Sequence, residues 1–205
     1  MEHVVAALFE VPSEAYQAFT ELRTFPQNDD TRLAQAVLVK KENGVITVAD
    51  AFNPLAQASD DMLTGTLIGS VLGILGGPLG VLFGAGVGAW VGSVGGTDEA
   101  LAQGTLIEAV ATRMKNGDVG IITLAQEKSE APLDQFFGKF RTIVARWDAW
   151  RIQQEVVDAL EVQADLQAKA RAELKAKRSQ ECKEKLEEFR QSIQQKFDEL
   201  KAKFK

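Results

Sequence analysis

The sequence has very few of the residues that build metal centres, disulfides and nucleophilic sites. Among its 205 residues there is one cysteine, Cys182, and one histidine, His3. A single cysteine excludes a disulfide within the chain and is compatible with a reducing compartment. One histidine and one cysteine offer too few ligands for a zinc site. The two could in principle form a catalytic pair, but we favour a simpler interpretation, with His3 opening a strand and Cys182 on an apolar helix face.

An excess of positive charge is also lacking. The net charge is −6 and the pI is about 5.0, which argues against a general nucleic-acid binder. Residues 148–165 carry one Lys+Arg against five Asp+Glu, whereas residues 166–205 carry 12 against 7, so only the last part is basic. The N-terminus has no basic stretch before its short apolar run, so we expect no signal peptide.

The first fifty residues read as a small α/β unit. Residues 4–9 form an apolar, β-branched run, and residues 36–41 and 45–49 are two further strand-like runs. Between the last two lies Glu42-Asn43-Gly44, and Asn-Gly is the strongest short-range signal of a β-hairpin. A helix is expected from Pro12 onward, with Ser13 able to cap it and Glu14 in its first turn.

The same unit continues after a long apolar insertion. Asp98-Glu99 is expected to open a helix that ends near Asn116-Gly117, and residues 119–124 predict a strand. Residues 133–140 have the spacing of a short amphipathic helix, and residues 142–147 could form a fifth strand. The order β-α-β-β-α-β predicts an α+β fold of the ferredoxin-like type, built from residues 1–59 and 97–147.

Charged side chains are absent from Met62 to Thr97. Glycine recurs there at every fourth residue in two registers, which places the glycines in a stripe along a helix where another backbone can approach closely. A break at Gly76-Gly77-Pro78 predicts two helices, Met62–Leu75 and Pro78–Val94, each about 20–25 Å long. The expected packing interface consists of Gly65, Gly69, Gly73, Gly77, Gly76, Gly80, Gly84, Gly88, Gly92 and Gly96.

Residues 60–96 therefore form a glycine-zipper hairpin, for which we weighed several environments. Each helix falls short of the ~30 Å hydrocarbon core, so a hairpin that dips into a bilayer fits better than two standard spans. Packing between subunits is the other favoured environment, because a glycine-rich hairpin buried alone would be unstable in water. The run Gly84–Gly88 lacks the strand and the Lys-Ser/Thr of a phosphate loop, so no nucleotide cofactor is expected. Four acids bracket the hairpin and could form a carboxylate site, but we favour solvated helix ends and N-terminal helix charges: Asp60, Asp61, Asp98 and Glu99.

Neither glycine nor proline occurs from Asp148 to Lys205, and this composition predicts a long helix. Its distal part has an eleven-residue apolar repeat, which we interpret as an oligomerisation seam. The neighbouring lysines Lys196, Lys201, Lys203 and Lys205 would also suit a membrane-surface helix. The seam consists of Cys182, Leu186, Phe189, Ile193, Phe197, Leu200 and Phe204.

Three stretches in this order resemble a bacterial family of glycine-zipper membrane proteins of unknown function, akin to short general-stress proteins. They are VVAALFEVPSEAYQAFTELR, GTLIGSVLGILGGPLGVLFGAGVGAWVG, and GDVGIITLAQEKSEAPLDQFFGKF with TIVARWDA after it. The resemblance covers about residues 3–150 and leaves the tail outside. It implies membrane association and a stress-related role, and it brings no catalytic residue with it.

The sequence thus predicts a non-enzymatic, membrane-associated homo-oligomer without cofactor, metal or nucleic acid. The hairpin would contact the lipid bilayer as a scaffold or a pore, and the α/β domain would face the cytoplasm. The alternative is a soluble homo-oligomeric module in which the hairpin is buried between subunits.

Overall fold

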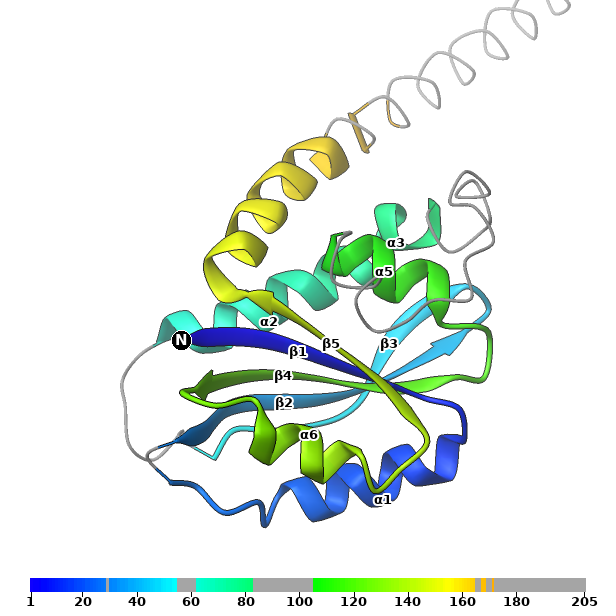
Figure 1. The fold of residues 1–205 in the computed structure, drawn as a ribbon. Coiled ribbons are helices and arrows are strands. Elements are labelled where there is room, and N and C mark those ends of the chain that lie inside the picture. The colour runs from blue at the N-terminus through cyan, green and yellow to red at the C-terminus, as the bar shows by residue number, and fades with distance from the viewer. Residues whose placement is uncertain (29, 55–61, 83–104, 165–166, 169–170, 172–205) are drawn as a thin grey trace, which may run out of the picture. The chain divides into compact units, whose positions relative to one another are not determined.

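The structure is a computed structural model that describes residues 1–28, 30–54, 62–82, 105–164, 167–168 and 171 (Figure 1). The chain divides into two compact units, Met1–Gln163 and Ala164–Lys205. All contacts reported below belong to the first unit.

The first unit mixes strands and helices along the chain. After β5 the chain is helical over residues 149–164, and we call residues 149–163 the exit helix. The other elements are β1 (Glu2–Phe9), α1 (Pro12–Leu22), β2 (Thr31–Glu42), β3 (Val45–Phe52), α2 (Met62–Leu75), α3 (Pro78–Leu82), α5 (Leu106–Arg113), β4 (Val119–Glu127), α6 (Ala131–Phe137) and β5 (Thr142–Asp148).

The strands form one sheet in the order β3-β2-β4-β1-β5, and every neighbouring pair is antiparallel. Because β1 and β2 both run antiparallel to β4, they run in the same direction and β4 separates them. The fold is therefore α+β, with β2, β4 and β1 in the interior of the sheet and β3 and β5 at its edges. Seven of the nine β4 residues from Val119 to Ala125 are buried without interruption, as expected for a strand covered on both faces.

One face of the sheet is covered by α1 and α6 (Figure 1). The buried residues of α1 follow helical spacing, and they pack on alternate residues of β1 such as Val5 and Ala7. Aromatic rings fill the end of this layer, with Phe9, Phe136 and Phe137 in edge-to-face contacts at 5.1 and 6.4 Å between centroids.

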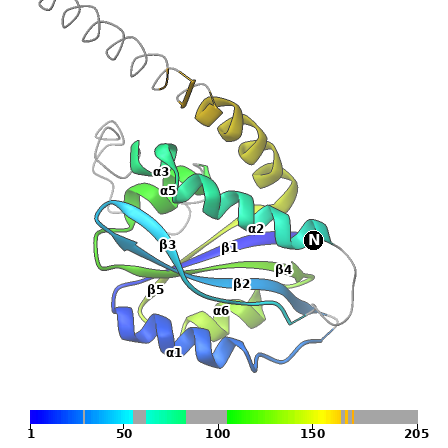
Figure 2. The ribbon, with the colours of Figure 1, turned by 180° about the vertical axis from the view of Figure 1, so that it is seen from behind.

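The opposite face is covered by α2, α3 and α5, which Figure 2 shows from behind. The intervening residues of β1 and β4, such as Val4, Ala6 and Ile122, are buried although they belong to the other side of the pleat. The segment between the β2–β3 hairpin and β4 thus completes a three-layer arrangement, with helices on both sides of the sheet.

Several sequence predictions are confirmed. The Asn43-Gly44 turn joins β2 to β3, with φ of 53° and 80° at its two residues. The helix predicted at Met62–Leu75 has those bounds, and α3 begins at Pro78 as expected. The fifth strand is present as β5.

The position of the predicted third strand differs from the expectation. In a ferredoxin-like sheet the third strand of the β-α-β-β-α-β order lies between the first two. From the sequence we expected residues 45–49 to be that third strand. In the structure β4 occupies this position and β3 lies at the edge. The reason is the two-residue turn, which pairs β3 with the free side of β2, while the more apolar β4 takes the interior.

Two helix ends also differ. Helix α1 starts at Pro12 with Val11 as N-cap, so Ser13 lies inside the first turn and does not cap. The start predicted at Asp98-Glu99 lies outside the described residues, and α5 itself begins at Leu106, because extended Thr105 caps it through the bond from the Glu108 amide to its hydroxyl. It ends at Arg113, ahead of the predicted end at Asn116-Gly117.

Candidate assembly surface

Helix α2 presents two unlike faces. Its inner face is apolar and packs on β2, β3, β4 and α5. Gly69 and Gly73 lie on the outer face and are exposed, and a Cβ added at either glycine would meet nothing within 4 Å. The stripe predicted from the sequence is therefore open along this part of the helix. The fully buried residues of the inner face are Ile68, Val71, Ile74 and Leu75.

Three other predicted interface glycines serve the bend between α2 and α3. A Cβ at Gly80 would overlap the Leu75 carbonyl group. At Gly77 it would lie 2.7 Å from Gln163 Oε1, and at Gly76 it would lie 3.1 Å from the Ile46 oxygen. These glycines let α2, α3 and the exit helix approach one another within a single chain.

The remaining predicted residues have a different status. Gly65 belongs to α2, one turn before Gly69. The other candidates lie outside the described residues: Gly84, Gly88, Gly92, Gly96, the acids Asp60, Asp61, Asp98 and Glu99, and the seam Cys182, Leu186, Phe189, Ile193, Phe197, Leu200 and Phe204.

The exit helix is fastened to α5 by a carboxylate. The two oxygens of Glu155 accept the backbone N–H groups of Leu106 and Ile107 at 2.9 and 2.7 Å. These are free amides at the N-terminus of α5, where the helix dipole favours negative charge. On the same side, Ile152 and Val156 are buried. The exit helix thus has an inner face that belongs to the core of the first unit.

Large apolar residues are exposed on the exit helix among charged and polar ones, and the sequence analysis missed them. Trp150, Val157 and Leu160 are 69, 54 and 46% exposed. Their spacing of seven and then three residues is the a-to-a-to-d pattern of helices that pair, so a signal was available in the sequence. From the sequence we instead placed the oligomerisation seam on the more regular repeat in residues 182–204. We call these three residues the outer seam.

The other end of α5 is held by a buried lysine. Lys41 is only 4% exposed, and its Nζ donates to the Ala111 and Met114 carbonyl oxygens at 2.7 and 2.9 Å. The carbonyl groups of a last helical turn have no partners within the helix, so a cation there is favourable. Burial lowers the pKa of Lys41, and the nearby Asp118 opposes that shift.

A charged cluster lies where β1, β4 and β5 meet α6. Glu127 Oε2 is 3.0 Å from His3 Nδ1 and 3.2 Å from Arg146 Nε. Arg146 Nη2 also pairs with Asp134 at 2.7 Å. Burial acts to lower the pKa of Arg146, but the Glu127 and Asp134 carboxylates outweigh it and raise that pKa overall. The paired charges join four elements, and Glu127 itself is 3% exposed.

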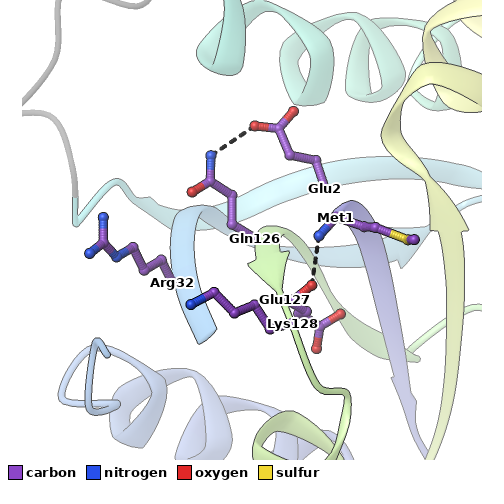
Figure 3. A pocket seen from close by; sticks show the side chains of 6 residues that line it. All are labelled: Met1, Glu2, Arg32, Gln126, Glu127 and Lys128. Carbon is purple, nitrogen blue, oxygen red and sulfur yellow. Dashed lines mark hydrogen bonds between the residues drawn. The ribbon is translucent and has the colours of Figure 1, made fainter. Parts of the chain in front are cut away.

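Next to this cluster, on the other side of β4, lies a pocket of about 420 Å³ (Figure 3). The amino terminus donates to the Glu127 carbonyl oxygen at 2.7 Å, and Gln126 donates to Glu2 at 2.9 Å. Several of its polar groups are therefore engaged with one another. The pocket is lined by Met1, Glu2, Arg32, Gln126, Glu127 and Lys128.

Neither the cluster nor the pocket provides a recognisable catalytic arrangement. Within the described ranges, no three His, Cys, Asp or Glu side chains are grouped so that they could hold a metal ion. His3 is engaged by Glu127 and, at 3.6 Å, by Asp148 rather than by a nucleophile. We therefore regard the exposed faces of α2 and the exit helix as the candidate functional surface.

Comparison with known proteins adds no assignment. No family model, curated protein or solved structure matches the chain. As for a bilayer, none of the helices in the described part of the chain has both the length and the apolar character needed to cross one.

Proposed function

We propose that this protein is a non-enzymatic self-assembly module whose copies pack through the open glycine face of α2. The main supporting observation is the contrast between the two sides of α2. The apolar side of α2 is buried in its own domain, whereas Gly69 and Gly73 point away from the core into open space.

The physical case concerns what these glycines cost. Glycine in an exposed helix interior destabilises a protein by roughly 0.5–1 kcal/mol relative to alanine. Among the described residues, nothing lies within 4 Å of a Cβ added at Gly69 or Gly73. Close approach of a second helix backbone would use this space, since small residues at four-residue spacing let two helices pack tightly.

A lipid bilayer is the second candidate partner for this region. The uncharged run from residue 62 to residue 97 favours it, and the family resemblance of residues 3–150 points to membrane association and a stress-related role. In that case the assembled protein would be a membrane scaffold or a pore, with the α/β domain on the cytoplasmic side. Release of a dye from liposomes separates the two forms, because only a pore causes leakage.

We also propose a finer description of the fold. Strands β1, β2, β4 and β5 with helices α1 and α6 follow a β-α-β-β-α-β order, and β4 separates the parallel strands β1 and β2. This set forms a ferredoxin-like domain. The chain from β3 to α5 is then a single insertion that covers the second face and carries the glycine helices.

The test is the double substitution Gly69→Leu with Gly73→Leu, studied by analytical ultracentrifugation of the full-length protein. New side chains at these positions meet open space in the monomer, so the fold should persist. They should weaken self-association at least about tenfold, because the backbones can no longer approach. Thr112→Leu on the exposed surface of α5 is the matched control and should leave association unchanged.

Flotation with liposomes of anionic and of neutral lipid decides between the two partners. Wild-type protein that sediments as an oligomer and does not float supports the proposal. Protein that floats, stays monomeric without lipid, and loses flotation in the double variant shows that the glycine face binds lipid instead. Unchanged association of a folded double variant would contradict the proposal.

A further inference from the structure

We propose that the outer seam of the exit helix is a second, separate interface, and that it binds the basic C-terminal segment, residues 166–205, of a second copy of this chain. The inference rests on exposure, spacing and charge at the exit helix, and not on the glycine face of α2.

The exit helix has more apolar surface than one domain uses. A helix on the surface of a domain normally carries one apolar stripe, which faces the core. Here Ile152 and Val156 already supply that stripe, while Trp150 is 69% exposed on the other side. Large exposed aromatic residues at a regular helical spacing are typical of a protein interface.

The surroundings of the outer seam indicate the partner's charge. Asp158 and Glu161 are exposed on the exit helix, and Glu161 follows Val157 by about one helical turn. Arg151 is the only basic residue from 148 to 165, against five acids. A second exit helix would bring like charges together, so we expect a basic partner.

The chain itself contains a segment with the required chemistry. Residues 166–205 carry 12 Lys+Arg against 7 Asp+Glu, and the sequence from 182 to 204 has apolar residues at helical spacing. A basic, amphipathic segment complements an acidic helix that has an exposed apolar seam. In a pair of copies, each would offer one acidic and one basic element, and a two-fold arrangement would form this contact twice.

The surface beside the outer seam can receive a side chain. A hollow of about 490 Å³ lies next to Trp150 and is lined by Met1, Glu2, Asp148, Ala149 and Trp150. It has two acids, Glu2 and Asp148, at its margin. An incoming apolar side chain flanked by lysine would fit such a site.

A charge-swap experiment on the full-length protein tests this inference. Variant A carries Asp158→Lys and Glu161→Lys, and variant B carries Lys196→Glu, Lys201→Glu and Lys203→Glu. Each variant alone should self-associate at least about tenfold more weakly than wild type, because the attraction between opposite net charges is lost: variant A makes residues 148–165 neutral, and variant B makes residues 166–205 slightly acidic. Mixed in equal amounts, A and B should regain association, since the acidic exit helix of B meets the basic segment of A, and the new lysines of A meet the new glutamates of B.

A second variant tests the apolar part. Replacing Trp150, Val157 and Leu160 by Gln should weaken association about tenfold or more and leave the circular dichroism spectrum unchanged, because all three are exposed. Val48→Gln is the matched control, since Val48 is 49% exposed on the edge strand β3.

Three outcomes would overturn the inference. They are a wild-type chain that is monomeric at all concentrations, variants A and B that associate as wild type does, and a mixture of A and B that fails to recover. The last result would show that the acidic helix meets a different partner. Performing the swap in the Gly69→Leu and Gly73→Leu background separates this interface from the proposed glycine interface, because recovery there requires the outer seam alone.

Discussion

Lys41 shows how a single side chain secures an element distant in sequence. Its ammonium group closes the C-terminus of α5 from a strand that lies 70 residues earlier. We predict that Lys41→Met lowers the free energy of unfolding by about 1–3 kcal/mol, because the Ala111 and Met114 carbonyl groups lose their buried donor.

The measurement is urea denaturation followed by circular dichroism. Lys40→Met is the control, since Lys40 is more exposed and pairs only with the neighbouring Glu42, so its loss should cost less than about 0.5 kcal/mol. Equal effects of the two substitutions would show that the contacts of Lys41 with α5 contribute nothing.

Glu14 links α1 to the start of β5 in a way that depends on pH. The Arg141 backbone N–H donates to Glu14 at 2.8 Å, and this bond, together with the guanidinium, lowers the pKa of Glu14 from 4.5. A carboxyl group whose pKa is lower in the folded state stabilises the protein above its unfolded pKa. This stabilisation disappears as the pH falls through the folded pKa.

We therefore predict that Glu14→Gln is less stable than wild type at pH 6 and that the difference shrinks as the pH falls below 4.5. Chemical denaturation of both proteins at a series of pH values measures this. A difference that grows on acidification would contradict the assigned direction of the pKa shift.

Local contacts were predictable at the residue scale, and distant contacts were not. The Asn43-Gly44 turn follows from two adjacent residues that tolerate positive φ. By contrast, nothing near Glu155 in the sequence indicates that it caps a helix 48 residues away. His3 was expected only to begin a strand, and its contact with Glu127 depends on the pairing of β1 with β4.

Among the elements, the glycines of the α2–α3 hairpin fall into two classes, which replacement by alanine distinguishes. We predict that Gly73→Ala stabilises the monomer by about 0.5–1 kcal/mol, because the position is helical and its Cβ meets open space. Gly80→Ala should destabilise it by about 1–3 kcal/mol, because the same group would overlap the Leu75 carbonyl.

Thermal and urea unfolding at low protein concentration measure both effects apart from any association. Two stabilising substitutions would mean that α3 can move away from Leu75 at little cost. Two destabilising ones would mean that the outer side of α2 is already in contact within the monomer, and the open stripe would have to be abandoned.

Element types followed from periodicity, whereas strand order did not. The four-residue glycine repeat and the break at Gly76-Gly77-Pro78 identified α2 and the start of α3, because these are properties of adjacent turns. The neighbours of β4 depend on which strand can be buried on both faces. The sequence does not indicate this, because it does not show that α2 covers the second face of the sheet. In the sequence the α2–α3 hairpin likewise looks like a separate apolar segment, because the sheet residues on which it packs lie far from it along the chain.

For the molecule as a whole, the two helical layers make the sheet the centre of one core. The layer of α2, α3 and α5 contains Ile68, Ile74 and Leu106, all fully buried. The layer of α1 and α6 contains the fully buried Leu22 and Phe137. The exit helix joins the layer of α2, α3 and α5 through Ile152 and Glu155. Since every layer shares the sheet, we expect the first unit to unfold cooperatively.

We predict that a chain ending at Gln163 folds and unfolds in a single transition. Its core retains every buried contact described for the first unit, and the residues removed belong to the second unit. Coincident curves from circular dichroism and from tryptophan fluorescence, to which the buried Trp147 contributes, would establish two-state behaviour.

The same shortened chain also tests assembly, because it lacks the basic segment but keeps both the glycine face of α2 and the outer seam. If the outer seam binds residues 166–205 of a second copy, the shortened chain should bind a separate peptide of that sequence and lose affinity as salt is raised. A shortened chain that unfolds in two steps would mean that residues after Gln163 support the core. One that folds but does not bind the peptide would leave the glycine face as the interface to pursue.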